Sequence, residues 1–280
     1  MSNRQQRRAE QRAKKKQGID QERVEVEFIQ PWSDVLMRTR LSDEVLNGML
    51  DITEQVLQDP DRKNWGDNLA GQIADEPIIP HQIMMDYKIG KDGNVFNWLM
   101  NMIGEYVKSC SLQQATSADA YKIKDAQWLT QMKSCWAISQ WEGEYNPIHI
   151  HTECALSTVM YLKVPEFLPS TKPERDDDGS IVFIGAGHSG SRLTRNIIKW
   201  KPKVGDFFIF PAHLQHTVYP FRTEGDEERR SVSFNADFIE KHEYEKQQEM
   251  VRQQQQQQAP PKPMPGAPEK LTIKTDNFTP

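Results

Sequence analysis

His149, His151 and Glu153 alternate along one short segment and could together bind a metal ion. The chain of 280 residues has only seven histidines, so the pair is a concentrated signal. In an extended strand, residues two apart point to the same face. All three side chains would then project into one cavity, where imidazole and carboxylate groups can bind a divalent metal. The segment therefore predicts a metal site.

We expect a third ligand from a distant strand that faces the first, and His216 is the best candidate. Gly205 and Asp206 turn the chain, residues 207–210 form a buried strand, and Pro211 opens a loop that leads to His216. His213 lies three residues earlier, inside that loop, and we expect it to be solvated or to support the metal ligands without binding the metal itself. Because His149 and His151 already form a candidate site, we expect His216 to bind the metal rather than to have a structural role.

Residues 229–235 read Arg-Arg-Ser-Val-Ser-Phe-Asn and follow His216 after thirteen residues. Strand alternation divides them into two faces: Arg229, Ser231, Ser233 and Asn235 on one, and Arg230, Val232 and Phe234 on the other. An arginine beside a hydroxyl on an inward face forms a receptor for a carboxylate, because the guanidinium binds with two N–H groups and the hydroxyl adds a donor.

The second half of the chain predicts many short strands with no helical pattern between them. Turn residues separate these strands, as at 142–143, 176–179 and 223–226. Such a series favours an antiparallel sandwich or barrel, and a double-sheet jelly roll fits the number of strands. The predicted strands are residues 135–141, 154–164, 180–184, 197–201, 206–210, 216–221 and 229–235.

The first part of the chain predicts supporting helices. Ser42 is a plausible N-cap for an amphipathic helix that Asp59-Pro60 ends, and a second helix starts near Asn94. We expect both helices to pack against the sheet. The irregular segment 64–80 would cover one mouth of the fold, and the loops 169–179 and 185–195 would border it. The fold class is therefore mainly β with an α-helical N-terminal part.

Charge and composition divide the chain into four parts: a basic disordered tail (1–22), a helical scaffold (23–128), a β core (129–242) and a Gln/Pro-rich disordered tail (243–280). Residues 1–17 hold seven Lys or Arg against one Glu, so contact with nucleic acid or an assembly is an alternative to a merely solvated tail. The net charge of -5 gives no overall reason to expect such contacts.

Two further features bear on location. No apolar run approaches the ~20 residues that a membrane span needs. Three cysteines, an odd number without CxxC spacing, indicate reduced thiols and predict a cytoplasmic protein. The sequence names no substrate and indicates no oligomeric state.

Four elements agree in order with a known family. They are His-x-His or His-x-acid at 149–153, Leu-Ser-x-x-x-Tyr-Leu at 156–162, Gly-Asp-apolar-Phe-Pro at 205–211 with a distal His216, and Arg-x-Ser-x-Ser-Phe-Asn at 229–235. This set resembles the 2-oxoglutarate- and Fe(II)-dependent oxygenases, in particular a branch found in bacteria and marine phages. The resemblance covers about residues 130 to 238.

The resemblance implies a double-stranded β-helix, the jelly roll, with Fe(II) held at one end. It implies 2-oxoglutarate as cosubstrate, O2 as oxidant, and a hydroxylase that releases succinate and CO2 while it oxidises an unidentified substrate. Ascorbate would serve as a reductant. Arg229 and Ser231 would bind the distal carboxylate of 2-oxoglutarate, and Tyr161 would add a hydrogen bond. A phage-encoded chain would work in the host cytoplasm.

Two questions stay open. The metal ligands are either His149, His151 and His216, which we favour, or the family's usual pattern with Glu153 in place of His149. The function has two alternatives besides the oxygenase. One is a cupin-like metalloenzyme without 2-oxoglutarate, which would leave the Arg-x-Ser pair unexplained. The other is a non-catalytic jelly-roll module tethered by its tails.

Overall fold

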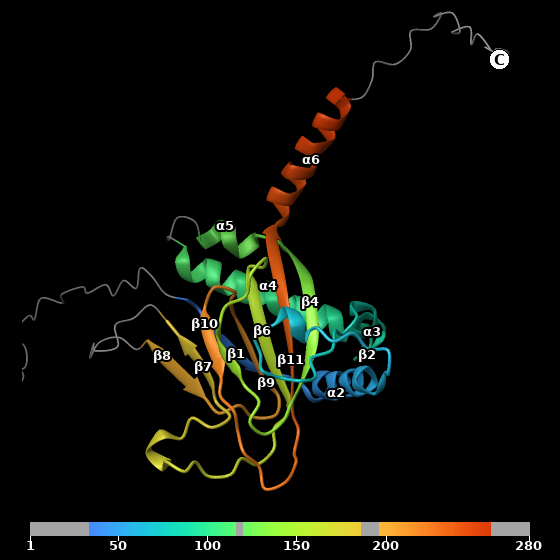
Figure 1. Cartoon of the computed structure of the whole chain (residues 1–280). Coiled ribbons are helices and arrows are strands. Elements are labelled where there is room, and N and C mark those ends of the chain that lie inside the picture. Colours follow the sequence, from blue (N-terminus) through green and yellow to red (C-terminus); the bar gives the residue numbers. More distant parts are fainter. Residues whose placement is uncertain (1–33, 116–119, 186–195, 259–280) are drawn as a thin grey trace, which may run out of the picture. The chain divides into compact units, whose positions relative to one another are not determined.

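The computed structural model describes residues 34–115, 120–185 and 196–258, and two antiparallel sheets dominate them (Figure 1). The five-stranded sheet has the order β1 (Met37–Arg40), β9 (Asp206–Pro211), β6 (Leu156–Lys163), β11 (Arg229–Glu240), β4 (Trp128–Gln140). The four-stranded sheet has the order β5 (Asn146–His149), β10 (Gln215–Val218), β7 (Ile181–Ile184), β8 (Ile197–Trp200). A separate hairpin joins β2 (Lys88–Ile89) to β3 (Gly93–Asn94).

The strand order is that of a jelly roll. From β4 to β11 the chain passes from one sheet to the other at every step except β7 to β8, which are neighbours in the smaller sheet. Apolar side chains from both sheets meet between them: Val159, Tyr161, Phe208 and Phe210 from the larger sheet, and Ile181, Phe183 and Val218 from the smaller. The predicted double-stranded β-helix is confirmed.

Helices cover the outer face of the larger sheet (Figure 1). They are α2 (Asp43–Gln58), α3 (His81–Asp86) and α4 (Val95–Gln114), and α5 (Ala120–Asp125) lies against α4. Single 3-10 turns lie at η1 (Gly66–Asn68) and η2 (Pro173–Arg175). The apolar stripes of α2 and α4 pack against outward residues of the sheet in one cluster. Each fully buried Leu, Ile or Val contributes roughly 1.5–3 kcal/mol, so this packing fixes the helices on the sheet.

Both predicted helix starts are confirmed by their caps. The Ser42 hydroxyl accepts a hydrogen bond from the Val45 amide at 3.4 Å, and the Asn94 side chain accepts one from the Asn97 amide at 2.8 Å. Each cap satisfies one of the backbone N–H groups that the first turn of a helix leaves unpaired.

The neighbouring strands β4 and β11 are longer than predicted, because they pair along their whole length, past a register shift at Asn235.

The C-terminal boundary differs from the prediction. We expected a disordered tail from residue 243, whereas Lys241–Gln258 forms helix α6, which includes the glutamine run. The side chains of residues 241–254 are exposed, so burial does not hold this helix. Its Glu, Lys, Gln and Met residues are strong helix formers, and this propensity favours the helix over an extended tail. The tails at 1–22 and 259–280 lie outside the described residues, and their roles stay predictions.

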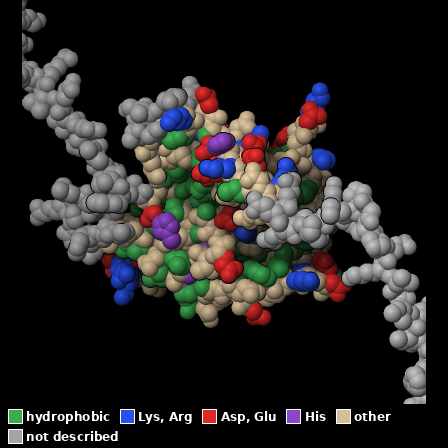
Figure 2. Space-filling view, turned by 90° about the horizontal axis from the view of Figure 1, so that it is seen from above, with side chains coloured by type: hydrophobic (Ala, Val, Ile, Leu, Met, Phe, Trp, Pro, Cys, Tyr) green, Lys and Arg blue, Asp and Glu red, His purple; other side chains and the backbone are tan. Residues whose placement is uncertain are grey.

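Two observations concern the hydrophobicity of the described helices and the charge on one face of the surface. No helix in the described ranges combines the length and hydrophobicity that crossing a membrane requires. On the face seen in Figure 2, Lys and Arg side chains are interspersed with Asp and Glu, and hydrophobic side chains lie between them. That face therefore presents mixed charge rather than a basic surface for nucleic acid.

Gly179 offers a test of how the segment between β6 and β7 packs against Phe167. Its φ is +69°, and a Cβ there would lie 2.2 Å from a Phe167 ring carbon. Gly143 has a similar φ of +83° but open space around it. We expect Gly143→Ala to cost about 1–2 kcal/mol, the strain of a left-handed residue, and Gly179→Ala to cost about 1–3 kcal/mol more because Phe167 must move. Urea unfolding of both variants measures the difference, and equal losses would contradict this packing.

Candidate metal and carboxylate site

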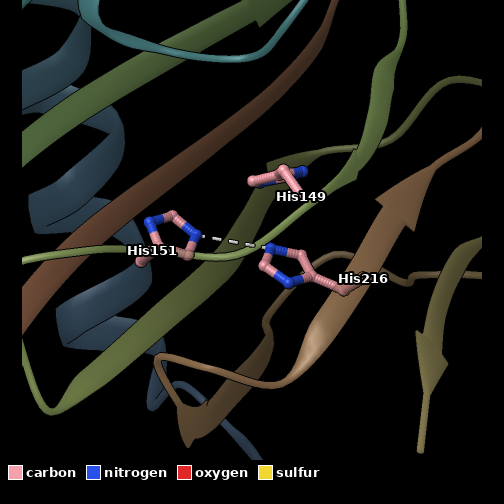
Figure 3. A group of neighbouring side chains, drawn as sticks. All are labelled: His149, His151 and His216. Carbon is pink, nitrogen blue, oxygen red and sulfur yellow. Dashed lines mark hydrogen bonds between the residues drawn. The ribbon is translucent and has the colours of Figure 1, made fainter.

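Three histidines converge at one end of the space between the sheets (Figure 3). His149 ends β5 and lies directly opposite His216 of β10 in the antiparallel pairing, so the two rings share a face. His151 follows in the next loop, where its backbone N–H donates to the Ala212 carbonyl at 2.9 Å. One nitrogen of each ring lies within 4.8 Å of the other two. This spacing suits a single metal ion bound by three imidazoles.

Backbone carbonyls fix which nitrogen of two rings is free. His149 Nδ1 lies 2.8 Å from the Pro147 carbonyl, and His216 Nδ1 lies 2.9 Å from the Leu214 carbonyl. A carbonyl can only accept, so in both rings Nδ1 carries the proton and Nε2 keeps its lone pair. His216 Nε2 lies 3.4 Å from His151 Nε2. The unprotonated nitrogens are thus available to a metal between the rings.

Burial keeps the three rings neutral. It lowers the pKa of His151 to about 3, and it lowers the pKa of His216 to about 3, in each case with help from the neighbouring imidazoles. Burial also lowers the pKa of His149, against the opposing effect of the Pro147 carbonyl. Neutral imidazole is the form that binds metal, so this environment prepares the rings for a cation at neutral pH.

Glu153 lines the same cavity as the histidines but does not join their close group of ligand atoms. Strand β5 stops at His149, so strict alternation ends there. Glu153 has a φ of +61° and an exposed side chain. In the described part of the chain, the close group of ligand atoms consists of the three histidines. His213 also lies apart, where its Nε2 meets the Asp34 carboxylate at 2.9 Å.

Arg229 lines the same cavity and is completely buried. Its Nη1 donates to the Gly179 carbonyl at 2.7 Å, its Nη2 donates to the Gln140 side-chain oxygen, and its guanidinium carbon lies 4.8 Å from the centre of the Phe221 ring. Burial lowers the pKa of Arg229 to about 10, so it stays charged at neutral pH. Among the described residues no carboxylate pairs with it, and its Nε has no partner.

The next strand residue shows the opposite environment. Arg230 points to the helical face, where it binds the Glu54 carboxylate at 2.8 Å and the Glu228 carboxylate at 2.7 Å. The predicted alternation of β11 is therefore confirmed. One arginine of the pair is neutralised by the protein, and the other is left for a ligand.

Two more polar groups stand near Arg229. Ser231 is the direct partner of Tyr161 in the pairing of β11 with β6, and both residues line the cavity. The Tyr161 hydroxyl is buried without a hydrogen-bond partner, and burial raises its pKa to about 12. A buried cation without an acidic partner and a buried hydroxyl without a hydrogen-bond partner are costly unless a ligand completes them. A carboxylate fits both.

The histidines and Arg229 share one cavity of about 740 Å³. This volume lies in the range of small-molecule sites, so the cavity has room for a ligand of drug-like size. The sequence predicted this strand but not which of its faces points inward, and Trp136, Ile138 and Gln140 of β4 line the cavity. It did not identify the lining residues of segment 64–78, which are Trp65, Asn68, Leu69, Ala70 and Glu76.

The sequence predicts that segment 64–80 covers one mouth of the fold, but its residues show no periodicity that marks an inward face. Loop 169–179 contributes no lining residue and instead supplies the Gly179 carbonyl that holds Arg229. Residues 186–195 lie outside the described ranges, so the expectation that this loop borders the mouth stays a prediction.

Comparison with known proteins agrees with this geometry. Residues 134–235 match a family described as "Putative 2OG-Fe(II) oxygenase". No curated protein matches the chain.

Solved structures are similar at low identity. A prolyl-4-hydroxylase from Pseudomonas putida matches at 13% identity over 72% of this chain and 92% of that chain, with a TM-score of 0.43. The viral collagen prolyl hydroxylase of Paramecium Bursaria Chlorella virus-1 matches at 13% over 72% and 94%, with a TM-score of 0.40. The epimerase SnoN from nogalamycin biosynthesis matches at 14% over 73% and 78%, with a TM-score of 0.43.

The buried histidines predict how stability depends on pH. Because the folded pKa of His216 is below its unfolded value near 6.5, the unfolded state binds more protons between pH 3 and 6.5, and stability falls as pH is lowered through this range. At pH 5 the loss is on the order of 2 kcal/mol for such a histidine. We expect metal-free His216→Asn to lose less stability than wild type between pH 7.5 and 5 in urea titrations.

The comparison between variants isolates this histidine. Glu76, whose pKa is raised to about 7 by burial, acts in the opposite direction, because its contribution falls as pH rises toward 7. It is present in both proteins and cancels in their difference. His213→Asn, at an exposed position, is the control. If His216→Asn and wild type show the same slope, the histidine is not buried in its neutral form.

Proposed function

We propose that the protein, whose residues 134–235 match the 2OG-Fe(II) oxygenase family, is an Fe(II)- and 2-oxoglutarate-dependent dioxygenase that hydroxylates a C–H bond of its substrate. One observation carries the proposal. Three neutral histidines, of which His216 is buried and the other two are half-buried, line the same cavity as a buried arginine without an acidic partner. The first suits a divalent metal, and the second suits a carboxylate of the cosubstrate.

His149, His151 and His216 are the proposed metal ligands. Their Nε2 lone pairs, fixed in two rings by Nδ1–H bonds to carbonyls, would bind Fe(II) on one side and leave its other positions to ligands from the cavity. An all-histidine set carries no negative charge, so the charge of the bound metal would be balanced mainly by 2-oxoglutarate. Glu153 remains the alternative to His149, and variants decide between them.

The residues around Arg229 would hold the cosubstrate. We assign the distal carboxylate of 2-oxoglutarate to the Arg229 guanidinium and the Ser231 and Tyr161 hydroxyls, which would satisfy the buried groups that have no partner. With Fe(II), 2-oxoglutarate and O2 bound, the oxidation would transfer one oxygen atom to the substrate and one to succinate, with release of CO2. The protein would orient these reactants, and apolar residues such as Ile138 and Phe210 would exclude water.

Free thiols at Cys110, Cys135 and Cys154 agree with a reducing compartment, and we propose the cytoplasm as the site of action.

Succinate formation tests the reaction itself. We expect purified protein with Fe(II), ascorbate and 2-oxoglutarate to release succinate, at least in slow turnover without substrate, and we expect His151→Ala and His216→Ala to reduce this at least 100-fold with loss of bound Fe(II). His213→Ala, an exposed histidine, should keep both. Anaerobic iron binding and succinate release are measured together.

The same assay separates the competing hypotheses. Loss of iron in His149→Ala but not in Glu153→Gln supports the all-histidine set, and the reverse supports the carboxylate. Stoichiometric iron without succinate would refute the proposal in favour of a cupin-like metalloenzyme, and absence of both would favour a non-catalytic module.

Arg229 and Arg230 form a matched pair for the cosubstrate site. Arg229→Lys keeps the charge but loses the two-pronged grip, so we expect 2-oxoglutarate to bind at least tenfold more weakly. Arg230→Lys changes only the contact with Glu54 and Glu228 on the helical face, and we expect at most a twofold change. Calorimetric titration of the Mn(II)-loaded proteins without O2 measures both affinities. Equal weakening in the two variants would exclude this assignment of faces.

A further inference from the structure

Glu76 is a second buried ionisable group of the cavity that the proposed reaction does not use. The residue is 1% exposed and lines the cavity. Its Oε2 is buried without a hydrogen-bond partner, and no described residue donates a hydrogen bond to its carboxyl. Buried carboxyl groups in folded proteins almost always have such partners. An unpartnered carboxyl in a cavity wall therefore points to a ligand.

The backbone around Glu76 is held firmly by both sheets. The Ser139 amide donates to the Asp75 carbonyl at 3.0 Å and the Ala137 amide donates to the Pro77 carbonyl at 2.9 Å, which fixes the segment along the edge of β4. The Gln72 amide donates to the Tyr145 carbonyl at 2.8 Å, next to β5. Segment 64–78 thus bridges an edge strand of each sheet, and the position of Glu76 is set by the fold.

Glycines allow the segment to fold closely over the carboxyl. A Cβ on Gly71 would lie 3.3 Å from Glu76 Oε2 and 2.6 Å from Asn146 Oδ1, and a Cβ on Gly66 would lie 3.6 Å from Glu76 Oε2. The Asn64 side-chain oxygen accepts the amides of Gly66 and Glu76, each at 3.1 Å, and ties both ends of this turn together. The carboxyl is enclosed by backbone rather than by cations.

The electrostatic surroundings of Glu76 are negative. Burial and the nearby Glu144 carboxylate raise the pKa of Glu76 to about 7. Glu144 itself is fixed, because it accepts the Ala74 amide at 2.9 Å and the Trp141 amide at 2.8 Å. Two carboxyl groups without a cation between them repel an anion and attract a positive charge, and the attraction is strong where water is excluded.

We propose that Glu76 binds a cationic nitrogen, an ammonium or guanidinium group, of the substrate that is oxidised in this cavity. The inference rests on the proposed function for the reaction and adds the substrate class. Arg229 and Glu76 then divide the cavity between an anionic cosubstrate and a cationic substrate. The N–H groups of a cation would donate hydrogen bonds to the Glu76 carboxyl, which has no such donor among the described residues.

Small probes of matched shape test the proposal without knowledge of the substrate. Propylguanidinium and butylammonium carry the charge, and propylurea is the neutral counterpart of propylguanidinium. Each is titrated into full-length protein, with and without Mn(II) and 2-oxoglutarate, and followed by tryptophan fluorescence, because Trp65 and Trp136 line the cavity. We expect at least one cation to bind wild type at least tenfold more tightly than propylurea, and the better of the two identifies the nitrogen group.

Glu76→Gln and Glu105→Gln are the matched variants. Both remove one carboxylate, but Glu105 is an exposed residue of α4 away from the cavity lining. We expect Glu76→Gln to lose at least tenfold in cation affinity and to bind propylurea as wild type does, whereas Glu105→Gln keeps the preference. Because the substitution replaces a buried carboxyl without a partner by a neutral amide of the same shape, we expect Glu76→Gln to fold, which thermal unfolding verifies.

The outcomes are separable from those of the oxygenase test. Cations that bind wild type no better than propylurea would overturn the proposal whether or not the variant folds. Unchanged cation binding in Glu76→Gln would also overturn it, as would an equal loss of 2-oxoglutarate affinity, which would make Glu76 part of the cosubstrate site. None of these measurements needs turnover, so a failure here leaves the succinate result untouched, and a failure to form succinate leaves the cation result standing.

Discussion

The cost of burying the Arg229 charge is the constraint on which the site depends. A buried guanidinium without an acid is unfavourable unless its N–H groups are paired. The protein meets part of this cost with the Gly179 carbonyl, the Gln140 side chain and the face of the Phe221 ring. These partners come from the loop before β7, from β4 and from the segment after β10, so one charge ties both sheets together at the base of the cavity. The Nε of Arg229 has no hydrogen-bond partner among the described residues.

Strand β11 shows how one alternation separates support from chemistry. Arg230 is neutralised by Glu54 of α2 and by Glu228, which fastens the helical layer to the back of the sheet. Its neighbour Arg229 turns to the other face and meets no acid there. The helices thus stabilise the larger sheet from outside without entering the cavity, and the difference between two adjacent arginines comes entirely from which layer each one faces.

Local sequence signals made the helix starts and the two faces of β11 predictable. Caps at Ser42 and Asn94, and the alternation of β11, depend on neighbours a few residues away, and the structure bears them out. Glu153 is an alternative ligand in the sequence prediction, but its separation from the three histidines escaped prediction because alternation is valid only while the strand lasts, and β5 ends at His149. Glu76 escaped it because segment 64–78 takes its position from long-range hydrogen bonds to the edges of two sheets. No periodicity within the segment encodes that placement.

The charges in the cavity also constrain the order in which ligands can enter. Arg229 alone would repel a second cation in the same low-dielectric space, whereas a carboxylate bound to it removes most of that repulsion. A metal ion bound by three neutral imidazoles would also repel a cationic substrate, because these ligands do not cancel its charge. A dianionic cosubstrate would reduce this repulsion as well. A cationic substrate at Glu76 would therefore bind more favourably after 2-oxoglutarate than before it. By linkage, it would strengthen cosubstrate binding by the same factor.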